Sequence, residues 1–169
     1  HFDTKAGIEE FEGANDSGSG VGALLELARA GAAWAWPWEV RLAFFDGEEC
    51  RLAYGPDDGL HGSRRLARRA VEEGWSPRVR AVIILDMIGD RDWTPTIPRN
   101  GTPALMAALF RAAGEMGLRD RVRLAPGPIL DDHQPFLDAG MPAVNLIDFE
   151  FGSAPGLNDF WHTRQDSLD

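Results

Sequence analysis

Three predominantly apolar runs, each followed by acidic residues, constrain the fold of this chain more than any other feature of its sequence. Residues 81–85 are all apolar and lead into Asp86, and residues 142–147 lead in the same way into Asp148. Residues 40–45 lead into a denser acidic group. Apolar runs of this length are typical of strands in a sheet that is covered on both faces.

Segments with helical spacing alternate with these runs. The first begins near Asp16 or Ser17, either of which suits an N-cap. We expect an α/β fold in three layers, with a mixed, mostly parallel sheet and helices on both faces. The 169 residues, 18.6 kDa, are expected to form a single domain. The expected helices are 17–30, 63–73, 103–116 and 132–138, and a short strand is expected at 121–124.

The same alternation predicts where a functional site lies. Parallel strands end at one edge of a sheet, and ligands of open α/β sheets bind beyond that edge. Glu48, Glu49 and Asp86 follow two of the expected strands, and Asp148 follows the third. We therefore expect a cluster of carboxylates at the carboxyl edge of the sheet.

Composition argues against several other functions. The formal net charge is −10, and an acidic surface repels the phosphate backbone of nucleic acids. No apolar run approaches the roughly 20 residues that a membrane-spanning helix needs. Cys50 is the only cysteine, so an internal disulfide or a Cys-x-x-Cys metal site cannot form. Lys5 is the only lysine, which restricts Schiff-base chemistry to that residue.

Histidines and carboxylates remain as the metal-binding candidates. Imidazole with carboxylate is a zinc-compatible set when thiolates are lacking, and a catalytic zinc keeps one position open. Of the adjacent Glu48 and Glu49, one can bind the metal while the other stays free as a base or acid. The candidates are His1, Asp3, Asp16, Glu48, Glu49, Asp86, Asp131, Asp132, His133 and His162.

Most of these residues also have a purely structural interpretation. Asp16 suits a helix cap, the Glu48–Glu49 pair suits a solvated turn, and His133 suits a cap or an ion pair. Asp86 is harder to explain in this way, because a carboxylate at the end of a buried strand needs a partner. The arginine-rich stretch 64–70 is expected to be a solvated helix face paired with acids.

Other catalytic classes fit the sequence poorly. The glycine-rich stretch 18–22 is not followed by the Gly-Lys-Ser/Thr of a phosphate-binding loop. Ser19 lacks the strained turn after a strand that a serine nucleophile requires. Nothing in the sequence around Cys50 marks an activated thiol.

Five segments, in order and spread over nearly the whole chain, carry a more specific signal. Together they resemble the zinc-dependent exopeptidase family that contains the double-zinc aminopeptidases and the glutaminyl cyclases. The resemblance implies an α/β domain with zinc at the edge of a mixed sheet, and it implies that family residues before His1 are missing here. The segments are His-Phe-Asp-Thr-Lys at 1–5, Gly-Ala-Asn-Asp-Ser at 13–17, Phe-Asp-Gly-Glu-Glu at 45–49, Leu-Asp-Met-Ile-Gly at 85–89 and Trp-His-Thr at 161–163.

Within the family, three details resemble the cyclase branch more than the aminopeptidases. They are an aromatic residue, Tyr54, in a long insert after Glu49, the triplet Asp131-Asp132-His133, and Trp161 before a histidine. Two positions depart from the pattern of the animal cyclases. Asn145 stands in place of a histidine, and Leu157 stands in place of an aromatic residue.

The resemblance also implies roles for individual residues. Asp16, Glu49 and His162 match the zinc ligands that both branches share. Glu48 matches the general base and acid of both. The chemistry of the two branches therefore begins from the same four side chains.

The branches differ in the residues around this centre. In the aminopeptidases, His1 and Asp86 would bind a second zinc. In the cyclases they do not, and Asp86 instead forms a hydrogen bond with Asp131 beside the catalytic glutamate. Tyr54 and Trp161 would wall a small substrate pocket.

These observations predict a zinc-dependent glutaminyl-peptide cyclotransferase, which converts an N-terminal glutamine of a peptide to pyroglutamate with loss of ammonia. The alternative is a zinc aminopeptidase that hydrolyses the N-terminal residue from peptides. One zinc ion is expected for a cyclase and two for an aminopeptidase. An inactive relative used for binding is a third hypothesis, which the intact set of ligands disfavours. The habit of the family suggests a periplasmic or secreted location.

Overall fold

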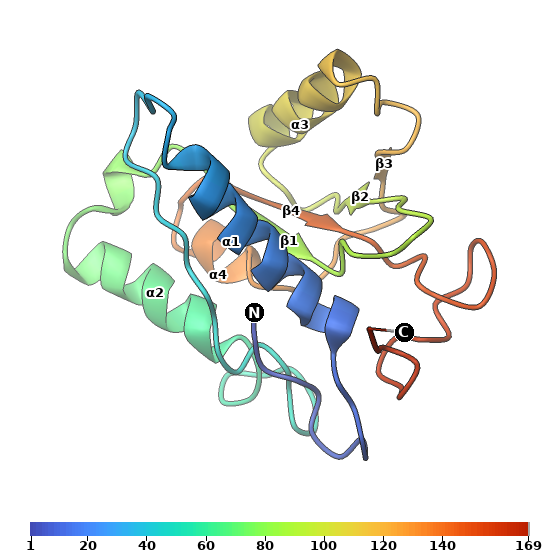
Figure 1. The fold of residues 1–169 in the computed structure, drawn as a ribbon. Helices are drawn as coiled ribbons and strands as arrows, with labels where there is room; N and C mark the ends of the chain where they lie inside the picture. The colour runs from blue at the N-terminus through green and yellow to red at the C-terminus, as the bar shows by residue number, and fades with distance from the viewer. Residues whose placement is uncertain (169) are drawn as a thin grey trace.

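The computed structural model describes residues 1–168 and contains a four-stranded mixed sheet (Figure 1). The strand order is β1-β4-β2-β3. β1 and β4 are parallel, β2 and β3 are parallel, and β2 runs antiparallel to β4. The predicted mixed, mostly parallel sheet is confirmed. The strands are β1 (Val82–Asp86), β2 (Thr96–Ile97), β3 (Arg123–Leu124) and β4 (Ala143–Ile147).

The four predicted helices are present, with small changes at their ends. A π-helical turn (Ala14–Ser19) precedes the first, and a 3-10 turn (Ser76–Arg78) follows the second. Asp16 and Ser17 have non-helical backbone angles, and the N-cap of the first helix is Ser19. The interpretation of Asp16 as a helix cap is therefore wrong. The helices are α1 (Gly20–Gly31), α2 (His61–Glu72), α3 (Pro103–Glu115) and α4 (Gln134–Asp138).

Helices cover both faces of the sheet, as predicted. Neighbouring residues of a strand point to opposite faces, and β4 shows this directly. Ala143 shares a core cluster with Ala67 of α2 and Phe136 of α4, whereas Val144 packs with Ala113 of α3. Figure 1 shows α1 crossing over β1.

Gly20 allows α1 to approach β1 closely. A Cβ atom at this position would lie 2.5 Å from the backbone oxygen of Leu85. No real side chain tolerates such a contact without a shift of the backbone. This requirement accounts for a glycine in the stretch 18–22, which the sequence had offered as a weak phosphate-loop candidate.

The prediction of a strand at 40–45 is wrong for the described residues. The segment forms no strand ladder, although Phe45 accepts a backbone hydrogen bond of 2.9 Å from Phe2. Phe45 is buried against Phe136, but Val40 and Phe44 remain 46% and 39% exposed. A strand needs a hydrogen-bonded neighbour as well as an apolar pattern, and here the pattern does not predict burial of Val40 and Phe44 either.

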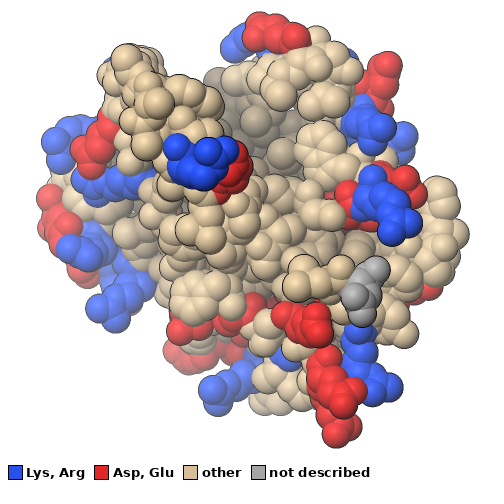
Figure 2. All heavy atoms as spheres, viewed as in Figure 1, with Lys and Arg blue, Asp and Glu red and all other residues tan. Residues whose placement is uncertain are grey.

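The outer surface carries the solvated arginines that the sequence predicted on α2. Arg68 and Arg69 pair with Glu72 and Glu73 one turn further along the helix. Figure 2 shows blue side chains interspersed with red ones on the side of the molecule where α2 lies. None of the helices within residues 1–168 is long and apolar enough to cross a membrane.

Candidate metal centre

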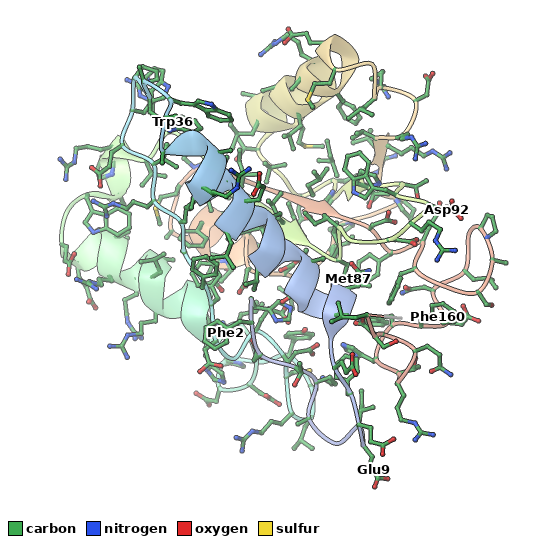
Figure 3. The ribbon with its side chains drawn as sticks, viewed as in Figure 1. Phe2, Glu9, Trp36, Met87, Asp92 and Phe160 are labelled. Carbon is green, nitrogen blue, oxygen red and sulfur yellow. The ribbon has the colours of Figure 1, made fainter. Side chains whose placement is uncertain are left out.

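Segments from both halves of the chain meet beyond the end of β1 and form a small cavity of about 110 Å³. Met87, which follows Asp86 and is labelled in Figure 3, lies in its wall. The polar part of the lining contains most of the residues that the sequence singled out. These are Asp16, Glu48, Glu49, Tyr54, Asp86, Asp131, Trp161 and His162.

Asp16 lies at the centre of this group, between two histidines. Its Oδ1 is 3.2 Å from Nε2 of His1, and its Oδ2 is 3.2 Å from Nε2 of His162. His162 Nε2 is also 2.8 Å from Oε1 of Glu49. The structure thus brings together the three predicted ligands Asp16, Glu49 and His162, with His1 on the opposite side of Asp16.

The backbone around Asp16 is held by Asp166, which the sequence analysis missed. The buried carboxylate of Asp166 accepts hydrogen bonds from the backbone N–H of Asn15 (2.6 Å) and of Asp16 (2.9 Å). The Asn15 side chain accepts a further bond of 2.8 Å from the N–H of Gly89, just after β1. No local pattern marks Asp166, because its role depends on a contact across most of the chain.

Asp3 orients the two adjacent glutamates through their backbone. Its carboxylate accepts hydrogen bonds of 3.1 Å from the N–H groups of both Glu48 and Glu49. The same carboxylate lies 3.2 Å from Nδ1 of His1, which leaves Nε2 of that ring facing Asp16. Such support of a ligand from behind is typical of metal sites. Asp3 therefore links the first residues to the Glu48–Glu49 turn.

The donor set fits a divalent cation such as zinc. His1, Asp16 and Glu49 each offer one ligand atom, and these atoms lie within 4.8 Å of one another. Among the described residues, Oε2 of Glu49 and Oδ1 of Asp86 are buried without a hydrogen-bond partner. Lys5 Nζ, 3.4 Å from Glu49 Oε2, is a nearby cation. Nitrogen and carboxylate ligands in this arrangement are those that zinc accepts.

The electrostatics of both histidines agree with a site built for positive charge. Burial lowers the pKa of His162, but hydrogen bonds with Asp16 and Glu49 outweigh burial and raise it to about 9. Burial likewise lowers the pKa of His1, and Asp16, Asp3, Asp86 and Glu48 together raise it far more. A bound cation has to displace these protons, so metal affinity should increase with pH.

Three further carboxyl groups gather next to this centre. Glu48, Asp86 and Asp131 are all buried, and burial raises the pKa of each. The negative charge of Asp131 adds to burial at Glu48 and raises its pKa to about 10. Like charges at close range cannot all ionise, so this group readily holds a proton.

Asn145 and the backbone of Asp132 both contact the carboxylate of Asp131. The Nδ2 group of Asn145 donates a hydrogen bond to Oδ2 of Asp131, and the N–H of Asp132 bonds to the other oxygen. Within the described residues, no hydrogen bond joins Asp86 to Asp131. A carboxylate oxygen can accept more than one hydrogen bond, so the bond between Asp86 and Asp131 that the resemblance implies stays a prediction.

Several predicted candidates lie outside the site or have no visible role in it. Asp148 accepts backbone bonds from Thr94 and Glu150 and so fixes a loop rather than joining the cluster. Asp132 and His133 are fully buried; Asp132 lies next to the side chain of Ser63, and the His133 ring has no hydrogen-bond partner among the described residues. His133 occupies the N-cap position of α4, as predicted, but its side chain forms no capping hydrogen bond.

Aromatic side chains line the remainder of the cavity. Trp161 stacks on His162, with 4.1 Å between ring centroids, and its Nε1 donates to Oδ2 of Asp16 (2.9 Å). Phe149 packs edge-on against Trp161. The sequence analysis missed the apolar lining residues, because apolar side chains around a pocket have the same pattern as a core. They are Met87, Ile129, Leu130, Ile147 and Phe149.

Comparison with known proteins places this arrangement in a family. Residues 1–169 match Peptidase family M28. The chain belongs to this family. The resemblance to zinc-dependent exopeptidases that the sequence motifs suggested is thereby confirmed.

Relatives of both kinds share the fold. A glutaminyl cyclase from an Acidobacteriales bacterium is 34% identical with a TM-score of 0.79, over 93% of this chain and 55% of its own. The glutaminyl-peptide cyclotransferase of Drosophila melanogaster is 31% identical over 99% of this chain and 53% of its own. A zinc aminopeptidase from Bacillus subtilis is 27% identical with a TM-score of 0.75, over 95% of this chain and 38% of its own. The chain therefore spans about half the length of the cyclase relatives.

Proposed function

We propose that this protein is a zinc-dependent glutaminyl-peptide cyclotransferase that acts on peptides with an N-terminal glutamine. The observation that carries the metal-dependent chemistry is the separation of roles in the adjacent glutamates, and the cyclotransferase relatives favour the cyclase over the aminopeptidase. Glu49 faces His162, whereas Glu48 faces the small cavity and the carboxyl group of Asp131.

The ligands in this proposal are Asp16, Glu49 and His162. Zinc bound there supplies a Lewis acid that polarises a carbonyl group. The cavity of about 110 Å³, walled by Tyr54 and Trp161, suits a single small side chain. It is the size of the space, together with the bound metal, that would select the glutamine amide over a bulkier group.

Glu48 moves the proton in this reaction. The α-amine of the substrate attacks its own side-chain carbonyl carbon, and the bond between that carbon and the amide nitrogen breaks. Glu48 accepts the proton that the amine loses and delivers it to the departing ammonia. Because nucleophile and carbonyl belong to one residue, positioning replaces a bimolecular encounter. A carboxyl group whose pKa is raised is suited to such a shuttle.

An aminopeptidase is the second candidate, and one observation favours it. The two oxygens of Asp16 face different histidines, and Nε2 of His1 lies 3.7 Å from Oδ1 of Asp86. This arrangement offers two neighbouring positions for a cation, with Asp16 between them. In this alternative Glu48 takes a proton from the water that attacks the first peptide bond.

Two substrates separate the candidates. The zinc-loaded chain is incubated with a peptide that begins with glutamine and with one that begins with leucine. Release of ammonia without cleavage supports the cyclase, whereas a freed amino acid supports the aminopeptidase. Glu48→Gln should lower either rate by about 10²- to 10⁴-fold while the zinc content stays unchanged. Absence of both products from the wild-type chain would contradict both functions.

A further inference from the structure

Tyr54 makes a contact that a pocket wall does not require. Its hydroxyl lies 3.1 Å from Oε1 and 3.1 Å from Oε2 of Glu48. Glu48 is only 5% exposed, whereas the tyrosine is 38% exposed, so the hydroxyl reaches inward from a surface loop. Asp3 holds the backbone of Glu48, but among the described residues only the Tyr54 hydroxyl forms a hydrogen bond with its carboxylate.

The loop that carries Tyr54 is fastened on both sides of it. Before Tyr54, the carboxylate of Asp58 accepts the backbone N–H groups of residues 51, 52 and 53, at 2.7, 2.8 and 3.1 Å. After Tyr54, the guanidinium of Arg64 donates to the backbone oxygens of Gly55 (2.6 Å) and Pro56 (2.7 Å). A loop tied in this way fixes the position of the side chain at its tip.

Gly59 provides the space in which the tyrosine ring lies. Its φ is +77°, and a Cβ atom there would lie 2.5 Å from Cδ1 of Tyr54. The next residue, Leu60, donates its N–H to the backbone oxygen of Glu48 (2.8 Å). The end of the loop is therefore attached to the residue that the tyrosine contacts.

We propose that Tyr54 is a positioning residue whose hydroxyl holds the carboxylate of Glu48 in its reactive orientation. The effect of this contact on catalysis rests on the proposed function. A hydroxyl at equal distance from both oxygens remains hydrogen-bonded to one of them whichever oxygen carries the proton. The carboxylate can thus take up a proton and release it without rotating, which a shuttle between an amine and departing ammonia requires.

Tyr54→Phe tests the proposal, because it removes the hydroxyl and keeps the aromatic wall. We expect kcat to fall by about 10-fold or more, as for loss of a hydrogen bond to a charged group, while KM stays within about twofold. Adding Tyr54→Phe to Glu48→Gln should lower kcat no further, since both changes act on one group. Unchanged kcat, or a raised KM alone, would show that the tyrosine is only a wall.

Two variants in the same loop serve as comparisons. Asp58→Ala frees the three backbone groups before the tyrosine, so it should lower kcat in the same direction as Tyr54→Phe. Asp57→Ala changes an exposed neighbour and should leave kcat and KM as they are. Full activity of Asp58→Ala would contradict a role for the fixed loop.

A spectroscopic measurement tests the contact without any turnover. Tyr54 is the only tyrosine, so labelling tyrosine with ¹³C at Cζ gives one NMR signal for this hydroxyl in the zinc-loaded chain. Glu48→Gln should shift the signal, and Asp57→Ala should not. If neither peptide reacts but Glu48→Gln shifts the signal, the proposed function fails and the contact stands. If the signal is insensitive to Glu48, the inference fails whatever the activity.

Discussion

Asp132 shows how a single carboxyl group can tie stability to pH. Its side chain is fully buried, and the Ser63 side chain, which lowers its pKa through a hydrogen bond, offsets only part of the effect of burial. Burial, and then the nearby charge of Asp131, raises the pKa of Asp132 to about 7. The neutral carboxyl is favoured in the folded chain. Its contribution to stability is therefore present below pH about 4 and is lost as the pH rises through about 7.

Asp132→Asn should remove this dependence. Without metal, the variant and the wild type should have similar free energies of unfolding near pH 4. At pH 8 the variant should be the more stable, by at most about 4 kcal/mol for a difference of about three pKa units. Urea unfolding in the presence of a chelator measures this difference. Asp120→Asn, an exposed change, should show no such trend, and a parallel trend in both variants would contradict the explanation.

Asp166 should control metal affinity although it is not a ligand. Asp166→Asn leaves one oxygen where two now accept the N–H groups of Asn15 and Asp16. Loss of such support weakens metal binding by about 10- to 100-fold in other sites. Titration of zinc against a competing chelator measures the change, with the exposed Glu26→Gln as control. If Asp166→Asn bound zinc with wild-type affinity, the turn at Asp16 would keep its conformation without both of these hydrogen bonds.

At the scale of single residues, the sequence predicts the candidate metal ligands better than the residues that hold those ligands in place. Asp16, Glu49 and His162 stand out because their residue types suit a metal, and the structure brings them together. Asp166 and Asn145 have no such signal, since their importance comes from hydrogen-bond partners in other segments of the chain. A hydrogen bond across most of the chain leaves no periodic trace in the sequence.

At the scale of elements, helix α1 contains two glycines, and close packing requires a small residue at only one of these positions. A Cβ at Gly20 would lie 2.5 Å from the Leu85 oxygen, whereas a Cβ at Gly22 would meet nothing within 4 Å. Both lie in the same helix. Substitutions at these two glycines therefore distinguish the effect of close packing on stability from the effect of helix propensity.

Gly20→Ala and Gly22→Ala should consequently have opposite effects on stability. Gly20→Ala should lower the free energy of unfolding by about 1–3 kcal/mol, because α1 has to move away from β1. Gly22→Ala should raise it by up to about 1 kcal/mol through helix propensity. Thermal or denaturant unfolding of the two variants gives the comparison. If both substitutions stabilise the chain, close contact between α1 and β1 is not the reason for Gly20.

The elements themselves were predictable where their patterns are long. Helix α3 and strand β1 have clear spacing and are confirmed, with ends displaced by one residue. β2 has only two residues, too few for any period to show. The prediction of a strand at 40–45 is wrong for a different reason. Its apolar pattern is clear, but a strand is defined by backbone hydrogen bonds to a neighbouring strand, which the segment does not form.

At the scale of the whole molecule, metal binding and folding are coupled. The candidate ligands come from residues 1, 16, 49 and 162, which meet only in the folded chain. A ligand that binds only the folded state stabilises it by about 2.7 kcal/mol at 100 times its Kd. The coupling predicts that zinc raises the unfolding temperature.

His162→Ala should abolish most of that zinc-dependent increase in Tm. His61→Ala alters an exposed histidine outside the cavity, so it should leave the increase intact. Differential scanning calorimetry with and without zinc provides the measurement. An equal increase in both variants would place the cation elsewhere in the molecule.

The tie between Asp166 and the Asp16 turn also bears on how the protein is made. During synthesis, N-terminal segments emerge from the ribosome before C-terminal ones, and they begin to fold as they emerge. Here the backbone N–H groups of Asn15 and Asp16 lack their carboxylate partner until residue 166 has been synthesised. A nascent chain should therefore bind zinc weakly until residue 166 has emerged, and more tightly once its carboxylate can accept these two N–H groups.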